Sequence, residues 1–189
     1  MGDTSDFRNG LCIEFKDDLY TLVQFQHVKP GKGGAFVRTK LKSLTNGRVI
    51  ENTFTSGEKI TIANVERRPY QFLYKDDTGY HFMHEQTFEQ LTMQPDLITA
   101  PDLLKEGQYV EITYHADTET PLTCELPAFV ELVITYTEPG VRGNTSSTSS
   151  LKPATVETGA QVNVPLFIES GEKVRIDTRD YTYVERVKG

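Results

Sequence analysis

The sequence has few cysteines and no long apolar run. These two features argue against a disulfide-stabilised secreted protein and a membrane-spanning protein. Its two cysteines, Cys12 and Cys124, lie far apart, with no Cys or His at metal-ligand spacing. Free thiols in a reducing cytoplasm are therefore expected rather than a disulfide framework. No apolar stretch approaches the roughly 20 residues that cross a bilayer. The segment Met1–Asp6 has neither the basic nor the apolar part of a secretory signal, so we expect a cytoplasmic protein without a membrane partner.

The signatures of enzyme active sites and metal centres are also missing. The phosphate-binding pattern G-x-x-x-x-G-K-[S/T] does not occur, and spacing supports no Ser/His/Asp or Cys/His arrangement. His81 and His84 are three residues apart, a spacing that sends two side chains to opposite faces of a strand. We expect no metal, no cofactor and no catalytic residue.

Basic residues are scarce overall, and the formal net charge is −7. Residues 1–64 carry nine Lys or Arg against seven Asp or Glu, residues 65–128 carry four against twelve, and residues 129–189 carry seven against eight. The acidic charge is therefore concentrated in the middle third. This division is consistent with RNA contact confined to chosen surfaces, and an ordinary solvated domain would show it equally well.

Short strand-like runs, separated by turn signals, fill the chain and predict an all-β protein of three small barrels in a row. We place the domains at residues 1–64, 65–128 and 129–189. In the second, strands and one brief helical turn at Leu103–Gly107 favour an OB-like barrel. The expected strands are Leu11–Phe15, Leu19–Val28, Ala35–Leu44, Val49–Phe54, Lys59–Val65, Tyr70–Lys75, Tyr80–His84, Tyr109–His115, Leu122–Leu126, Phe129–Thr137, Gln161–Ile168, Lys173–Asp177 and Thr182–Val187.

One expected hairpin loop presents a single cation, Lys32. Proline presets φ and glycine permits positive φ without steric cost, so both favour a tight turn. Strand-like segments flank the loop on both sides, which is the pattern of a hairpin. Lys32 is thus expected at the tip, with little bulk beside it. The supporting loop residues are Pro30, Gly31, Gly33 and Gly34.

The returning strand alternates between apolar and basic residues. Arg38, Lys40 and Lys42 fall on one face, about 7 Å apart, and Lys29 precedes the loop. A basic row that leads to a cationic tip suits a protein that follows a phosphate backbone. A solvated strand face would show the same pattern.

The run K-P-G-K-G-G-A-F-V-R-T-K-L-K, followed by Gly47-Arg48 and Glu51-Asn52-Thr53-Phe54, closely resembles bacterial elongation factor P. The resemblance continues to the C-terminus and implies an SH3-like (KOW-like) domain followed by two OB-fold domains. In that family the tip lysine is often covalently extended and enters the ribosomal peptidyl-transferase centre beside the peptidyl-tRNA. Lys32 is therefore the expected target of a lysine-modifying enzyme.

The C-terminal part carries a second set of matching motifs, including E-P-G-V-R-G-N-T at residues 138–145. The resemblance implies that Gly143, Asn144 and Thr145 contact the tRNA elbow, and that Tyr183 and Arg186 face the small ribosomal subunit. The chain has Asn144 where the family commonly has Asp, and serines in residues 146–150 where Ala and Gly are frequent. By composition alone, Glu138–Ser150 is typical of a flexible linker.

The resemblance implies a monomeric, non-enzymatic translation factor. It would bind the ribosome and P-site tRNA between the P and E sites and relieve stalling at consecutive prolines. The residues alone also allow a general RNA-binding or transcription-associated module of KOW and OB barrels, or an enzyme with a catalytic Lys32. Alternating aromatics are expected in a barrel core or in the seam between domains rather than stacked on RNA; they are Tyr70, Phe72, Tyr74, Tyr80 and Phe82.

Overall fold

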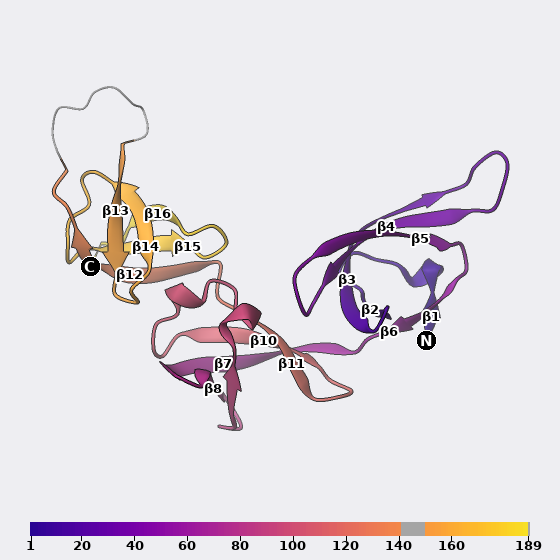
Figure 1. The fold of residues 1–189 in the computed structure, drawn as a ribbon, viewed down its shortest axis with the longest axis horizontal. Coiled ribbons are helices and arrows are strands. Elements are labelled where there is room, and N and C mark those ends of the chain that lie inside the picture. The colour runs from indigo at the N-terminus through magenta and orange to yellow at the C-terminus, as the bar shows by residue number, and fades with distance from the viewer. Residues whose placement is uncertain (141–149, 189) are drawn as a thin grey trace. The chain divides into compact units, whose positions relative to one another are not determined.

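The computed structural model describes residues 1–140 and 150–188 and shows an all-β protein (Figure 1). Within these residues the strands form three sheets, which confirms the predicted fold class. The chain divides into two compact units, Met1–Arg68 with Ile112–Thr123, and Pro69–Glu111 with Cys124–Gly189. No helix among the described residues is long and apolar enough to cross a membrane.

The first sheet has the strand order β1-β6-β2-β3-β4-β5. It comprises β1 (Gly2–Asp3), β2 (Cys12–Phe15), β3 (Asp18–Val28), β4 (Phe36–Ser43), β5 (Val49–Thr55) and β6 (Lys59–Ile62). The last five agree with the predicted strands to within a few residues. The sequence pattern missed β1 and the 3-10 helix η1 (Thr4–Asp6) that follows it, because a two-residue strand has no apolar alternation. The Asp3 carboxylate caps this helix by accepting the Ser5 backbone N–H at 2.7 Å.

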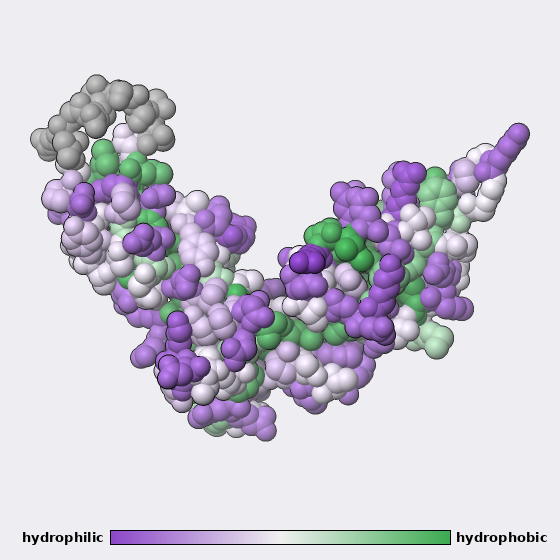
Figure 2. Space-filling view, viewed as in Figure 1, coloured by the Kyte–Doolittle hydropathy of each residue, from purple (hydrophilic) through white to green (hydrophobic). Residues whose placement is uncertain are grey.

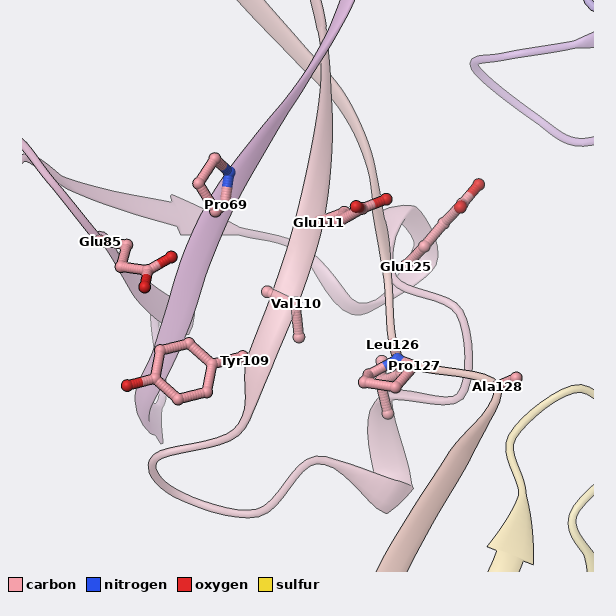
Figure 3. Close-up of a pocket in the computed structure, with 9 residues that line it drawn as sticks. All are labelled: Pro69, Glu85, Tyr109, Val110, Glu111, Glu125, Leu126, Pro127 and Ala128. Carbon is pink, nitrogen blue, oxygen red and sulfur yellow. The ribbon is translucent and has the colours of Figure 1, made fainter.

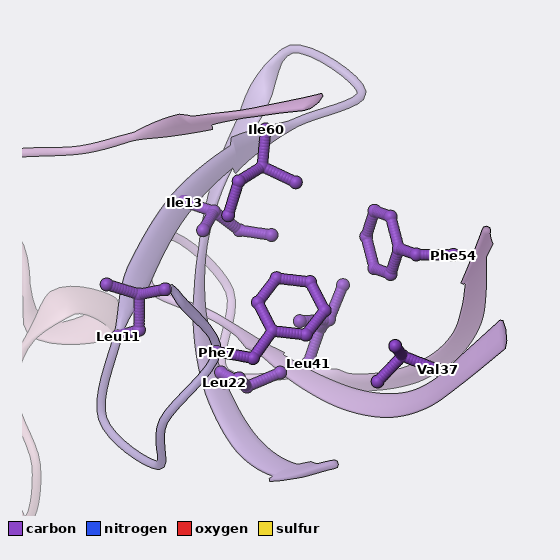
Figure 4. Packing of buried hydrophobic residues seen from close by; sticks show 8 residues of the cluster. All are labelled: Phe7, Leu11, Ile13, Leu22, Val37, Leu41, Phe54 and Ile60. Atoms are coloured by element: carbon purple, nitrogen blue, oxygen red, sulfur yellow. The ribbon is translucent and has the colours of Figure 1, made fainter. Parts of the chain in front are cut away.

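The core of the first unit lies inside this curled sheet (Figure 4). Each of its eight buried apolar side chains is at most 6% exposed. β4 contributes Val37 and Leu41, and β3 contributes Leu22 opposite Leu41. The pairing shifts at Val23, where a β-bulge leaves that residue 45% exposed. The remaining members of the cluster are Phe7, Leu11, Ile13, Phe54 and Ile60.

The second sheet has the order β11-β10-β7-β8-β9. Four of the five alternating aromatics are at most 5% exposed, which confirms their expected place in the core. Tyr74 is the exception: it is 45% exposed and stacks on the His81 ring at 4.5 Å between centroids. The strands are β7 (Val65–Asp76), β8 (Gly79–His84), β9 (Gln90–Met93), β10 (Tyr109–His115) and β11 (Thr120–Glu125).

The helical turn expected at Leu103–Gly107 lies earlier in the chain. The 3-10 helix η3 spans Pro101–Leu103, after η2 at Pro95–Leu97. Proline suits the first position of a helix because it has no N–H to lose. Gly107, expected as the helix cap, instead has φ +86° in the turn that enters β10.

The third sheet has the order β14-β13-β12-β15-β16. Its strand β13 was not predicted, because a lysine occupies a position on the buried face. Lys152 is only 7% exposed, beside buried Ala154 and Val156, and its ammonium donates to the Glu138 carbonyl at 2.6 Å. The strands are β12 (Phe129–Thr137), β13 (Leu151–Val156), β14 (Gln161–Pro165), β15 (Lys173–Asp177) and β16 (Thr182–Arg186).

The tip of the β10–β11 hairpin belongs to the first unit, where Arg68 holds it. The Arg68 guanidinium donates to both carboxylate oxygens of Glu119, at 2.7 and 3.0 Å, and also bonds Glu66. It stacks 4.3 Å from the centre of the Tyr114 ring. Glu119 and Glu66 raise the pKa of Arg68 above its ordinary value. We call residues 112–123 the clamp hairpin.

Both cysteines are free thiols, as predicted. Cys12 is half-buried and Cys124 is fully buried. Burial raises the pKa of the Cys124 thiol to about 12, so it stays protonated and unreactive at neutral pH.

Candidate nucleic-acid interface

The hairpin of β3 and β4 carries Lys32 at its tip, as predicted. The two strands stay paired up to Val28 and Phe36, and the loop runs from Lys29 to Ala35. Figure 2 shows the end of this hairpin as a narrow, mainly hydrophilic projection. Lys32 is exposed and has no hydrogen-bond or ion-pair partner in the described part of the chain. Its ammonium is therefore available to another molecule.

The loop glycines differ in what the fold requires of them. Gly33 has φ +104°, a conformation that side chains rarely adopt. Gly31 and Gly34 have no positive φ, and a Cβ added at either would meet nothing within 4 Å. Folding and packing thus explain glycine only at position 33. Pro30 and Lys29, at the base of the loop, are exposed.

The basic row has the alternation that the sequence predicts. Arg38, Lys40 and Lys42 are exposed, while Val37, Thr39 and Leu41 between them are at most 3% exposed. The Lys40 ammonium lies 3.9 Å from the Glu51 carboxylate. One acidic group therefore interrupts the row.

Amide side chains that the sequence reasoning did not select lie beside this row. The bulge at Val23 brings Gln24 opposite Lys40 and Gln26 opposite Arg38, so both amides share the exposed face. They line a groove of about 500 Å³ together with Asn52. Without the bulge, regular alternation from buried Leu22 would place Gln24 and Gln26 on the buried face. Their place beside the basic row therefore becomes visible only in the structure. The groove can accept phosphates on its cations and polar base edges on its amides.

Tyr183 and Arg186 lie on β16, where a second bulge sets their direction. Tyr183 pairs with Ile176 and Arg186 pairs with Val174, which leaves Val184 as the extra residue. Paired residues point to the same side of a sheet, so the bulge places both side chains on one face. Partial burial raises the pKa of Tyr183, and the nearby Arg186 opposes that rise.

Arg186 is held by neighbours within its unit. Its guanidinium bonds the Glu172 carboxylate at 3.0 Å and lies 5.9 Å from the centre of the Phe167 ring.

The predicted tRNA contacts Gly143, Asn144 and Thr145 lie outside the described residues. In residues 1–140 and 150–188, no three His, Cys, Asp or Glu side chains gather closely enough to hold a metal ion.

Comparisons with known proteins cover the whole chain. Residues 3–60 match the elongation factor P KOW-like domain, residues 65–122 its OB domain, and residues 130–186 its C-terminal domain. The chain is 64% identical to elongation factor P of Amoebophilus asiaticus, over 100% of this chain and 98% of that protein. It is 56% identical to elongation factor P 1 of Porphyromonas gingivalis, over 100% of both.

A solved structure of eukaryotic translation initiation factor 5A from Methanococcus jannaschii shares the fold. It aligns with a TM-score of 0.51 at 21% identity, over 65% of this chain and 93% of that one. The full-length sequence matches carry the assignment: the chain belongs to the elongation factor P family and is a translation elongation factor.

Proposed function

We propose that the protein binds the ribosome between the P and E sites and stimulates peptide-bond formation at consecutive prolines. In this proposal Lys32 reaches the CCA end of the peptidyl-tRNA. The observation that carries the proposal is an exposed lysine without a partner, at the end of a paired hairpin and between small residues. Membership of the elongation factor P family supports the ribosome as the partner.

The contribution to peptide-bond formation would come from positioning rather than from chemistry at the protein. Proline is a poor nucleophile, and its ring constrains the nascent chain. Holding the CCA end in a productive geometry lowers the barrier because less orientational freedom is lost in the transition state. The Lys32 ammonium offers three hydrogen-bond donors on a flexible stem. Covalent extension of this amine by a modifying enzyme would lengthen its reach.

The basic row and the groove beside it would hold the RNA backbone near the tip. Arg38, Lys40 and Lys42, with Lys29 at the loop base, would neutralise phosphates. A second contact is proposed through Gly143, Asn144 and Thr145 at the tRNA elbow. Tyr183 and Arg186 would face the small subunit from their common face of β16.

A reconstituted translation system tests the function directly. Adding the purified protein should speed synthesis through three consecutive prolines and leave a matched three-alanine reporter unchanged, because alanine is not a slow acceptor. The readout is the rate of full-length product formation. Equal rates with and without the protein on the proline reporter would contradict the proposal.

The basic row should set affinity for the ribosome. The double variant Arg38→Glu/Lys40→Glu removes two cations, so ribosome binding should weaken. The slope of the logarithm of the binding constant against the logarithm of the salt concentration should become shallower by about two, since about two fewer counterions are released on binding. The measurement is ribosome co-sedimentation across a salt series.

A matched control is Arg8→Glu/Lys59→Glu, which makes the same charge change at exposed positions of the same unit. It should leave the slope of the salt dependence close to that of the wild type. Identical slopes for the Arg38/Lys40 variant and the wild type would show that the row is ordinary solvated surface.

A further inference from the structure

A pocket of about 530 Å³ lies in the second unit, and none of the proposed RNA-contacting residues lines it (Figure 3). Its walls are mainly apolar and include Pro69 of β7, Tyr109 of β10 and Leu126 after β11. Three carboxylates, those of Glu85, Glu111 and Glu125, also line it. The pocket thus combines apolar walls with acidic charge.

Tyr109 is an exposed part of the apolar wall. It is 56% exposed at the start of β10, whereas the next residue, Val110, is 4% exposed and points into the core. The ring therefore contributes little to the core of its sheet. Exposed tyrosines at the edge of a pocket are frequent anchors for protein partners, because the ring offers a large rigid contact area and a polar tip.

The opposite sides of the pocket are fixed by the fold. The Glu85 backbone N–H donates to the Pro69 carbonyl at 3.2 Å, which holds the turn after β8 against β7. Glu125 is the last residue of β11, and Leu126 beside it is 8% exposed. Because these positions are set by backbone pairing, the carboxylates flank a preformed site.

The charge of the pocket decides what can occupy it. None of the described residues that line it is Lys or Arg, and residues 65–128 hold twelve Asp or Glu against four Lys or Arg. Within the described part of the chain, Glu85 and Glu125 have no ion-pair partner. Such a surface repels nucleic-acid phosphates and attracts cationic side chains.

We propose that this pocket binds an extended basic peptide segment of a protein partner. One apolar side chain of the peptide inserts between Tyr109 and Leu126, and flanking Lys or Arg side chains pair with Glu85 and Glu125. The proposal is independent of the Lys32 hairpin, which lies in the other unit. The RNA-directed face and the protein-directed face are therefore separate surfaces of opposite charge.

The test uses the full-length protein and fluorescein-labelled peptides Gly-Lys-Lys-X-Lys-Lys-Gly, in which X is Leu, Phe or Pro. Fluorescence anisotropy at physiological salt reports the Kd. At least one peptide should bind, and Glu85→Lys/Glu125→Lys should raise its Kd by about tenfold or more, since two charge pairs become repulsive. Tyr109→Ser should also weaken binding, by about fivefold, through loss of the apolar anchor.

The charge-matched control is Asp77→Lys/Glu106→Lys, at exposed positions of the same unit outside this pocket. It should change the Kd by less than about twofold, because salt screens distant charges. Equal weakening by the control variant would overturn the proposal in favour of bulk charge attraction. Binding by none of the three peptides would overturn it as well. A third outcome would also overturn the proposal: a short RNA displaces the peptide, and the pocket substitutions weaken this displacement. The occupant would then be a nucleic acid.

Discussion

Replacing Lys32 by alanine should abolish the stimulation of synthesis through consecutive prolines. The side chain is exposed and without a partner, so the free energy of unfolding should stay within about 0.5 kcal/mol of the wild type. The translation rate on a three-proline reporter and the urea unfolding midpoint together check this prediction. Lys59→Ala, at another exposed lysine of the same unit, should keep full activity.

The variant Lys32→Arg separates the charge of the tip from its covalent extension. Arginine keeps the cation but does not offer the amine that a lysine-modifying enzyme needs. If extension is required, Lys32→Arg should be as inactive as Lys32→Ala, and intact-mass spectrometry of protein from its native host should show an added mass that the Lys32→Arg variant lacks. Full activity of Lys32→Ala would contradict the role of the tip altogether.

The double variant Gly31→Val/Gly34→Val should lose activity by on the order of 100-fold without losing stability, because displacing a positioned group by about 1 Å has effects of that size. A Cβ at either position meets nothing within 4 Å in the free protein, and neither residue has a positive φ. A loss of activity without a loss of stability would therefore show that a partner approaches the loop closely.

A series of side-chain sizes provides the control for this prediction. Alanine, serine and valine at positions 31 and 34 should lower the translation rate in that order, while the unfolding midpoint stays constant. Gly33→Ala differs, because its backbone at φ +104° is strained by any side chain. Unchanged activity of the valine variant would mean that the loop is not closely packed against the ribosome.

The fold class and the Lys32 hairpin could be predicted because their signals are local. Alternation along Phe36–Ser43 places its basic residues outside, and turn-forming residues mark the loop. β13 could not be predicted, since Lys152 occupies a buried position where an apolar residue is expected.

The parts of the candidate site that escaped prediction depend on β-bulges. A bulge changes which face every later residue of a strand points to, and no residue type in the sequence marks its position. The bulge at Val23 brings Gln24 and Gln26 beside the basic row. The bulge at Val184 puts Tyr183 and Arg186 on one face. Regular spacing gives the wrong face in both strands.

The clamp hairpin makes the order of synthesis relevant to folding. Every residue of the first unit's apolar cluster lies between Phe7 and Ile60, so all of them leave the ribosome early. The bonds that complete the unit, from Glu119 to Arg68 and from the Ala116 N–H to the Asn64 carbonyl at 2.9 Å, need residues made only after 69–111. Because domains generally fold as they emerge from the ribosome, we expect the curled sheet that carries Lys32 to form first and the clamp hairpin to join it later. The last segment of the first unit, residues 112–123, is thus synthesised after most of the second sheet.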